Sequence, residues 1–463
     1  MPLLYTLRKK RHPNSMDAAS FQWLDTVCGP YALLCQTEGM LLPGAETILC
    51  GAVRETGAPL LYADAAIRTG KDELPLYKPD FAPDTLLRQN YVGSPLLLSN
   101  TLLLSLGGAP ERMNADEQFA LTLRAMLNAA QTVHVPHVLF AGGPPPAPRS
   151  VHPVETALLR LGRRGIAALG DVNDRFAIRY ALERKARVSV IVRSYGDPNA
   201  LRRTLESVEL CAGETEYEMI IAAGGIIQSA AAQYYRALER HGAARVVRCP
   251  GEENDARLKN IAAGCASGAY LLVMDAGTVA KTPNTLLQFL LEAQNSGAGV
   301  IAGWVEDERG LRHSSELTVD AQDIPRPVRA EEEPFANAGC THNATLLGGA
   351  IFVSAEAFGA AGGFDETFDS CWCETALSLT LAQRGRRNVV TPDICFQKTS
   401  AVVRPLSRRN RERCGDMFRA LRVQGDPMRS QNPAYLAAIR SKTGERRRDK
   451  KLKIMLDRTG GIL

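Results

Sequence analysis

Short apolar runs alternate with amphipathic segments from about residue 187 onward. Four of the runs are rich in β-branched and other apolar residues, which is typical of strands buried on both faces; they occupy residues 188–192, 219–223, 244–249 and 270–274. Segments with apolar residues at helical spacing lie between them, at 201–208, 230–240 and 254–266. This alternation indicates βαβ units, and it predicts a parallel sheet with helices on both faces.

The rest of the chain gives further boundaries. An apolar run at 346–353, a helical pattern at 376–384 and a strand pattern at 388–390 extend the same domain. Prolines are dense at 142–148, where no helix or central strand can continue, and residues 151–185 read as a bridging segment. We therefore expect an N-terminal unit at 1–141, a linker with a bridging helix at 142–186, the main α/β domain at 187–404 and a basic helical tail at 405–463.

A short loop follows each predicted parallel strand. Ligands of open α/β sheets bind outside the carboxyl ends of the strands, so these positions are the candidates for chemistry. They are the segments 193–196, 223–225, 250–252 and 275–278.

Several motifs in the main domain are specific in combination. They are the Gly-Gly-Phe-Asp-Glu stretch at 362–366, the Ala-Ser-Gly before the strand at 270–275, and Arg-Asn-Val-Val-Thr-Pro at 387–392. From about residue 187 to 400 the chain resembles the family-two inverting glycosyltransferases of the GT-A fold, which is Rossmann-like with a mostly parallel sheet. The N-terminal unit resembles the trailing half of a second, truncated GT-A-like unit, as in tandem polysaccharide-assembly transferases. The motifs for that second resemblance lie at 61–64, 78–84, 90–93 and 134–136.

The resemblance implies transfer of a sugar from a nucleotide-diphosphate donor to a hydroxyl acceptor, with inversion. The family holds Mg²⁺ or Mn²⁺ with an Asp-x-Asp pair after the fourth strand, where this chain has Asp275-Ala276-Gly277 and keeps one carboxylate. Glu374 falls on the family's catalytic base, and Glu can take the proton of the attacking hydroxyl. Lys398 is expected to offer positive charge to phosphate in place of a metal.

The other expected donor-binding residues are Arg193, Tyr195 and Gly224. On the acceptor side we expect Trp372, Asp365 and Gly363. Three positions depart from the family's pattern in the same direction, because polar donor contacts are missing at Ala223, Gly277 and Gln397.

Structural roles compete with these assignments. Asp275 could cap a turn, and Glu374 could be a first-turn acid that interacts with the helix macrodipole. Asp365 and Gly363 are better explained as shaping a loop, and Trp372 could close the core instead of stacking on a sugar ring.

In the N-terminal unit, the positions of the donor site and the base depart from those of a working transferase. Gln36-Thr37-Glu38-Gly39 occupies the place of the Asp-rich loop, and Gln118 the place of the base. We expect this unit to bind no nucleotide sugar and to serve as a packing or acceptor-side module.

Composition restricts the class of protein. The 463 residues are 45% hydrophobic and 23% charged, as in folded globular proteins, and 55 basic against 50 acidic residues leave +5, too little to indicate nucleic-acid binding. The 11 cysteines, without a C-x-x-C pair, read as reduced thiols, and no signal or membrane-spanning segment is evident, so we expect a cytoplasmic protein. Residues 440–458 carry nine basic and three acidic side chains, as in a solvated tail or one that contacts anionic lipid.

Two functions remain in competition. The first is a glycosyltransferase that extends a glycan or lipid-linked acceptor in surface polysaccharide assembly, cytoplasmic or peripherally bound to a membrane. The second is a catalytically inactive GT-A-like scaffold that binds glycan or a partner transferase. Nucleotidyl transfer is disfavoured, because the loop after the first strand lacks the glycine-rich, basic pattern that it needs.

Overall fold

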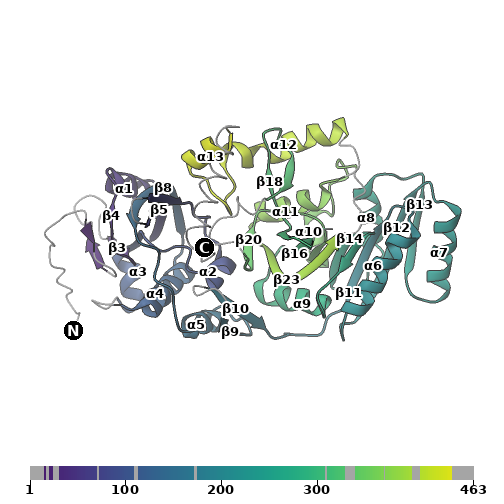
Figure 1. Ribbon diagram of the computed structural model, residues 1–463, viewed down its shortest axis with the longest axis horizontal. Helices are drawn as coiled ribbons and strands as arrows, with labels where there is room; N and C mark the ends of the chain where they lie inside the picture. The colour runs from purple at the N-terminus through teal and green to yellow at the C-terminus, as the bar shows by residue number, and fades with distance from the viewer. Residues whose placement is uncertain are drawn as a thin grey trace. The chain divides into compact units, whose positions relative to one another are not determined.

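The computed structural model describes residues 15–16, 20–23, 31–69, 72–108, 113–170, 175–307, 310–328, 339–369, 371–398 and 407–440 (Figure 1). The chain forms two compact units. Unit 1 comprises residues 1–179, 333–340 and 425–463, and unit 2 comprises 180–332 and 341–424. The helix α12 (Arg408–Gln424) therefore belongs to unit 2, and α13 (Pro433–Arg440) belongs to unit 1.

Unit 2 is built on a 10-stranded sheet. Its first four strands are β11 (Val188–Ser194), β12 (Tyr217–Gly225), β13 (Arg245–Pro250) and β14 (Tyr270–Asp275). They pair in parallel in the order β13-β12-β11-β14 (Figure 1). The predicted α/β fold with a parallel sheet is confirmed for this half. Three of the four predicted strands lie within these elements, and the fourth, predicted at 244–249, begins one residue before β13.

The second half of the sheet is mixed. The order continues with β22 (Ile351–Ser354), β16 (Val300–Glu306), β23 (Asn388–Lys398) and β15 (Thr278–Ala280). The β22 strand is antiparallel to both β14 and β16, β23 is parallel to β16, and β15 is antiparallel to β23. Short strands flank this half; they are β17 (Arg312–Ser314), β18 (Glu316–Val319), β19 (Pro325–Pro327), β20 (His342–Ala344) and β21 (Leu346–Leu347).

Helices cover both faces of this sheet, as expected. The alternation of side chains along β11 places Val190 in one hydrophobic cluster and Ile191 in the other. The helices of the first cluster are α6 (Pro198–Cys211), α7 (Ser229–Arg240) and α9 (Thr285–Ser296). Those of the second are α8 (Asp255–Ala263), α10 (Ala355–Ala361), α11 (Cys373–Gln383) and α12.

Local sequence explains where the site's helices begin. Before α6, Asp197 accepts a hydrogen bond from the Asn199 backbone N–H at 2.9 Å, and Pro198 occupies the first turn. Before α8, Asn254 accepts one from the Arg257 N–H at 3.0 Å. Both helices therefore start directly after the loops that follow β11 and β13.

Unit 1 has an 8-stranded sheet. Its strands are β1 (Ser15–Met16), β2 (Ser20–Trp23), β3 (Tyr31–Cys35), β4 (Gly39–Leu41), β5 (Leu60–Thr69), β6 (Asp72–Leu76), β7 (Leu96–Ser99) and β8 (Thr132–Gly142). The helices between them are α1 (Ala45–Thr56), α2 (Pro83–Arg88), α3 (Asn100–Ser105) and α4 (Ala115–Asn128). The segment after β8 forms α5 (His152–Arg160), β9 (Gly165–Leu169) and β10 (Phe176–Tyr180).

The central sheet of unit 1 repeats the topology of the second half of the unit 2 sheet. Unit 1 has the order β4-β8-β5-β7-β3, and unit 2 has β15-β23-β16-β22-β14. The relative directions also agree, because β5 and β8 are parallel, as β16 and β23 are, and the other pairs of both series are antiparallel. No counterpart of the strands β11, β12 and β13 occurs among the described residues of unit 1.

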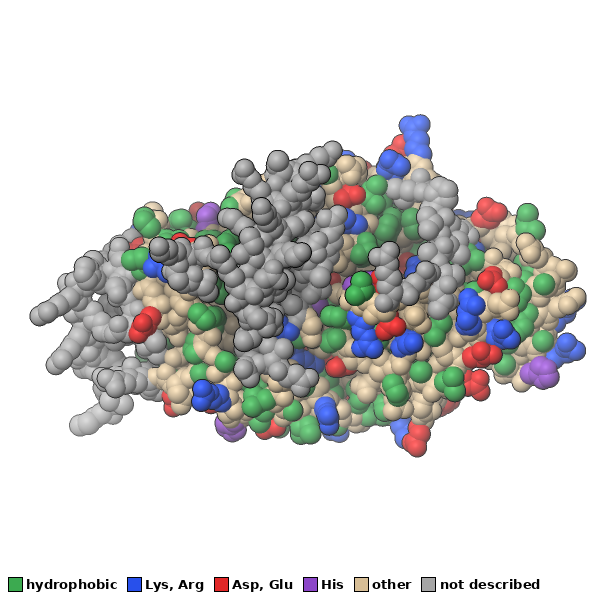
Figure 2. Space-filling view, viewed as in Figure 1, with side chains coloured by type: hydrophobic (Ala, Val, Ile, Leu, Met, Phe, Trp, Pro, Cys, Tyr) green, Lys and Arg blue, Asp and Glu red, His purple; other side chains and the backbone are tan. Residues whose placement is uncertain are grey.

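Three surface and chemical features follow from the described residues. On the coloured part of the face in Figure 2, acidic and basic side chains are interspersed. No described helix has the length and apolar character needed to cross a bilayer. Cys50 is disulfide-bonded, which corrects the expectation that all cysteines are reduced thiols. The basic segment 441–458 lies outside the described residues.

Candidate functional site

Asp275 ends β14 at the carboxyl edge of the parallel sheet. Its neighbour across the ladder is Arg193 of β11, and the Ala276 backbone N–H donates to the Arg193 carbonyl at 2.9 Å. The Asp275 side chain retains 37% exposure, although its Oδ1 atom is buried, so the carboxylate is only partly accessible to solvent. This is the edge of the sheet at which the sequence analysis predicts that the nucleotide-sugar donor would bind.

Glu374 reaches the same place from α11. It lies in the first turn of that helix, which follows Trp372, a residue with a positive φ of 71°. The Glu374 side chain is 13% exposed. A non-glycine residue in the left-handed region is uncommon, and this turn aims the start of α11 at the sheet edge.

Lys259 of α8 brings the two acids together. Its ammonium lies 3.1 Å from Asp275 Oδ1 and also contacts Glu374 Oε1, while its side chain is only 3% exposed. Asp275 and Glu374, separated by about a hundred residues of chain, therefore meet at one buried cation. The space between the two carboxylates is occupied by that ammonium.

The charges in this cluster stabilise one another. Burial raises the pKa of the Asp275 carboxyl, but the ammonium of Lys259, together with Lys398 and Arg193, outweighs burial and leaves the pKa below its usual range. Burial lowers the pKa of Lys259, but Asp275 and Glu374 outweigh it, and the pKa lies well above its usual value. Both groups are therefore ionised at neutral pH.

Arg193 and Tyr195 follow the first strand and face Asp255. Arg193 Nε donates to Asp255 Oδ1 at 2.7 Å, and the Tyr195 hydroxyl donates to Asp255 Oδ2 at 3.2 Å. The guanidinium also lies over the Tyr195 ring, 4.6 Å from its centroid. Arg193 is 1% exposed, so contact between its guanidinium and a donor would require it to leave Asp255. Burial, and then the Asp275 charge, raise the pKa of Tyr195.

Gly224 and Lys398 occupy different environments. A Cβ built on Gly224 would lie 2.4 Å from the Glu252 carbonyl oxygen and 2.5 Å from Leu258 Cδ1, so close packing of β12 against α8 explains the glycine. Lys398 is exposed and lies opposite Thr278 in the β15–β23 pair. This pairing places Lys398 opposite a residue only three positions after Asp275, and the charge of Lys398 helps to lower the pKa of Asp275.

The Gly-Gly-Phe-Asp-Glu loop is tied to its surroundings. Asn260 of α8 donates to the Phe364 carbonyl at 2.9 Å and accepts from the Phe364 N–H at 2.8 Å. Gly363 has φ 77°, and a Cβ there would lie 2.8 Å from Asn260 Oδ1. Asp365 accepts bonds of 2.7 and 3.0 Å from Arg413. These contacts give Gly363 and Asp365 a loop-shaping role.

Trp372 is half-buried and packs against the second hydrophobic cluster. Its indole Nε1 is buried, and it has no hydrogen-bond partner among the described residues. An indole N–H usually finds a partner when it is buried, so an acceptor group of a ligand would suit this donor.

The residues around Asp275 do not suit a divalent cation. Among the described residues, no group of three or more His, Cys, Asp and Glu side chains is arranged to hold a metal ion. The two carboxylates that do converge already share the ammonium of Lys259. A hard cation such as Mg²⁺ or Mn²⁺ prefers several oxygen ligands, and a positive charge in their midst repels it.

Sequence reasoning missed Lys259 and Asp255. The signal was present, because α8 buries Asp255, Ala256, Leu258, Lys259 and Ala262, which are spaced as the inward face of a helix. Charged residues on such a face are almost never buried unless they are paired. Asp255 and Lys259 lie four residues apart on the apolar face of this helix. Their presence there predicts that oppositely charged or hydrogen-bonding partners from other parts of the chain are buried against them.

In unit 1, the place that corresponds to Asp275 is neutral. Gln36 follows β3, accepts a bond from Asn90 Nδ2 at 2.7 Å and donates to Thr122 Oγ1 at 2.7 Å. Gln118, the counterpart of the base, donates to the Met113 carbonyl at 2.9 Å. The Gln36 amide thus binds two neighbouring side chains and the Gln118 amide binds the backbone, and neither residue supplies a carboxylate.

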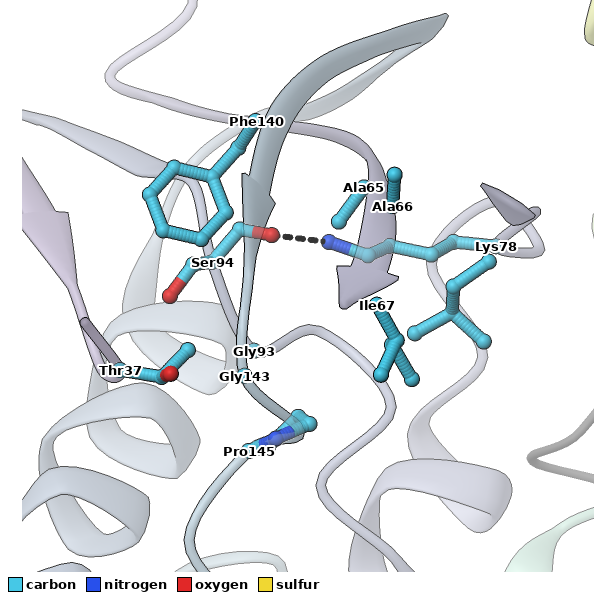
Figure 3. Close-up of a pocket in the computed structure, with 11 residues that line it drawn as sticks. Thr37, Ala65, Ala66, Ile67, Lys78, Gly93, Ser94, Phe140, Gly143 and Pro145 are labelled. Atoms are coloured by element: carbon cyan, nitrogen blue, oxygen red, sulfur yellow. Dashed lines mark hydrogen bonds between the residues drawn. The ribbon is translucent and has the colours of Figure 1, made fainter. Parts of the chain in front are cut away.

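A small cavity lies next to this network. It is lined by Thr37, Lys78, Ser94 and Phe140, among others, and Lys78 Nζ donates to the Ser94 carbonyl at 2.7 Å beside it (Figure 3). Its volume of about 10 Å³ has room for a single water molecule. Burial lowers the pKa of Lys78 to about 7. This cavity is far too small for a nucleotide.

A second buried polar cluster in unit 1 surrounds His134. Its ring nitrogens lie 3.0 Å from Asp64 Oδ1 and 3.0 Å from Asp80 Oδ1, and its ring stacks on Tyr62 with centroids 4.9 Å apart. Asp64 also accepts a bond from Asn432 Nδ2 at 2.7 Å, which fastens the segment before α13 to β5. Burial lowers the pKa of His134, but the two carboxylates outweigh it and leave the pKa raised.

No protein-family model matches the chain. Two curated relatives are similar in sequence. The O-antigen biosynthesis protein RfbC of Myxococcus xanthus is 24% identical over 356 residues, which cover 72% of this chain and 28% of RfbC. The protein y4gI of Sinorhizobium fredii is 21% identical over 408 residues, which cover 81% of this chain and 44% of y4gI. The chain thus spans less than half the length of either relative.

Several solved structures are partly similar. GalNAc-T7 with UDP, GalNAc and Mn²⁺ has a TM-score of 0.41 and 16% identity, over 52% of this chain and 49% of that one. The mannosyltransferase PcManGT from Pyrobaculum calidifontis, with GDP-Man and Mn²⁺, has a TM-score of 0.34 and 15% identity, over 57% and 66%. Residues 1–349 of TarS from S. aureus, with UDP, have a TM-score of 0.36 and 14% identity, over 55% and 70%.

Proposed function

We propose that unit 2 is a glycosyltransferase that moves a sugar from a nucleotide-diphosphate donor to a hydroxyl of a growing surface glycan. The observation that carries this proposal is the meeting of Asp275 and Glu374 at the carboxyl edge of the parallel sheet, with the exposed Lys398 in electrostatic range. Ligands of such sheets bind at that edge. The similarity to RfbC, whose name assigns it to O-antigen biosynthesis, supports a role in polysaccharide assembly.

In the proposed reaction, Glu374 acts as the general base. The oxygen of the acceptor hydroxyl attacks the anomeric carbon, and its proton passes to the Glu374 carboxylate. The bond between the anomeric carbon and the diphosphate oxygen breaks, and its electron pair leaves with the diphosphate. Attack from the face opposite the leaving group inverts the anomeric centre. Lys398 offsets the charge that develops on the diphosphate.

The remaining site residues take supporting parts in this proposal. Asp275 orients the donor from the end of β14, while Arg193, Tyr195 and Gly224 build the wall behind it. Trp372, with its unpaired indole N–H, contacts the acceptor sugar, and the loop of Gly363 and Asp365 forms the acceptor floor.

Unit 1 is proposed to be the trailing half of a second transferase unit of the same kind. The shared strand order and strand directions support that relationship. The neutral residues Gln36 and Gln118 and the water-sized cavity favour a packing or acceptor-side role over donor binding.

One observation favours a second candidate, a catalytically inactive scaffold that binds glycan or a partner transferase. The Lys259 ammonium stands between the two acids, so Glu374 must exchange this contact for an acceptor hydroxyl before it can take a proton. The residue types at Ala223, Gly277 and Gln397, which depart from the family's donor-binding pattern, point the same way.

Donor binding and donor hydrolysis separate the two candidates. A transferase should bind UDP- or GDP-sugars in isothermal titration and should release nucleotide slowly to water. Glu374→Gln should keep binding and lose turnover by roughly 100-fold or more, the usual contribution of a general base. Glu356→Gln is the matched control, since Glu356 is an exposed first-turn acid of α10 and its loss should leave turnover unchanged. Full activity in Glu374→Gln contradicts the assigned base, and absence of binding by any donor supports the scaffold.

A further inference from the structure

Lys259 is a charged side chain in a place where an apolar one would be expected. It belongs to the inward face of α8, it is 3% exposed, and its ammonium touches carboxylates from two other elements, β14 and α11. Tyr195 and Cys373 also lie within electrostatic range of it. A buried ammonium is tolerated only with such compensation, so the lysine and the two acids form one unit.

The charges of the surrounding cluster balance without any added ion. Asp255 is paired with Arg193 at 2.7 Å, with both side chains 2% exposed. Asp275 and Glu374 are matched by Lys259 inside and by Lys398 at the surface. A divalent cation at Asp275 would add two positive charges to a neutral cluster, next to the ammonium of a lysine side chain that is only 3% exposed.

We propose that Lys259 is the built-in cation of this site, in the position where a divalent ion would otherwise join the two carboxylates, and that Lys398 is the side chain that meets the diphosphate. The inference rests on the proposed function and deepens it, because it names the ligand class as a nucleoside diphosphate that binds without metal. Lys259 is a positioning residue, since it holds Glu374 and Asp275 at a fixed separation and faces no solvent. Lys398 is exposed and is free to approach a phosphate.

The wild-type chain allows a direct test. Titration calorimetry with UDP and with GDP is run once with EDTA and once with Mn²⁺, and electron paramagnetic resonance measures the binding of Mn²⁺ alone. We expect the nucleotide affinities to be the same with and without metal, and no Mn²⁺ binding at micromolar concentrations. Nucleotide binding that requires Mn²⁺, or tight binding of Mn²⁺ alone, overturns the inference and leaves the proposed function standing.

Two variants test the parts assigned to the lysines. Lys259→Met removes the charge but keeps the length of the side chain, so the freed carboxylates should gain measurable Mn²⁺ binding. Lys398→Met should weaken UDP or GDP binding by roughly 10- to 100-fold, the loss expected for charge-assisted hydrogen bonds. Lys281→Met is the control, because Lys281 is also exposed and directly follows β15 but is not among the main charges that lower the pKa of Asp275.

The outcomes are distinguishable. Absence of nucleotide binding under every condition refutes the proposed function and the role of Lys398, whereas Mn²⁺ binding to the wild type refutes the role of Lys259 alone. Equal losses in Lys398→Met and Lys281→Met also refute the role of Lys398. If Lys259→Met does not fold, the wild-type experiments with EDTA and Mn²⁺ still decide the question.

Discussion

Removal of the Lys259 ammonium tests the central contact of the site through stability, independently of any ligand. In Lys259→Met, a flexible apolar side chain of similar length replaces the lysine, so packing of α8 against the sheet changes little. The carboxylates of Asp275 and Glu374 then lose their shared counter-ion. The Asp275 side chain is 37% exposed and the Glu374 side chain is 13% exposed. The variant therefore isolates the effect of charge.

The expected magnitude follows from the burial of the three groups. Breaking a buried ion pair by removing one partner destabilises a protein by about 3–5 kcal/mol, because an uncompensated charge remains inside. Asp275 is more than a third exposed and solvent screens it, so we expect the lower end, about 3 kcal/mol, of which most comes from Glu374. Addition of Glu374→Gln to Lys259→Met should recover a large part of this loss, since the stranded charge is then removed.

Urea unfolding followed by tryptophan fluorescence measures this change, because Trp304 and Trp372 both belong to unit 2. Lys281→Met serves as the control, and an exposed substitution of this kind should change the free energy of unfolding by less than about 0.5 kcal/mol. A loss below about 1 kcal/mol in Lys259→Met, or no recovery in the double variant, refutes the reasoning that Lys259 is a buried counter-ion for both acids.

Two further predictions concern other parts of the molecule. The pKa of His134 is raised by Asp64 and Asp80, so the stability that this pairing gives to unit 1 is full below the ordinary value of 6.5 and is lost as pH rises through the raised value. The protection factors of β5 and β8, which correct the hydrogen-exchange rates for the intrinsic pH dependence of exchange, should therefore fall above that pH, and His134→Asn should remove this fall. Gly224→Ala should destabilise unit 2 by about 1–3 kcal/mol in urea unfolding, because its Cβ would overlap the backbone of the β13–α8 loop. Gly359→Ala, in the interior of α10 with nothing within 4 Å of the new Cβ, should instead stabilise the unit by about 0.5–1 kcal/mol, and equal effects of the two substitutions would contradict the packing argument.

The alternation of apolar runs and amphipathic segments was sufficient to locate the first four strands of unit 2 and the helices between them. That pattern is local, because a strand buried on both faces must be apolar throughout, whereas a surface helix must be apolar on one side. The strand directions in the mixed second half of the sheet could not be predicted in this way. The direction of β22 relative to β14 and β16 depends on the path of the chain through α9 and the short strands, which no periodicity records.

The sequence alone also determined which acids stand at strand and helix ends, because Asp275 directly follows an apolar run and Glu374 directly precedes a helical one. Tertiary structure alone decided what lies between them. Lys259 is neutralised by residues that follow it by 16 and by 115 positions, and Arg193 is committed to Asp255 of α8, 62 positions away. Charge compensation depends on distance in space, and a single sequence records distance only along the chain, so the cation of this site could be found only after the helix had been packed against the sheet.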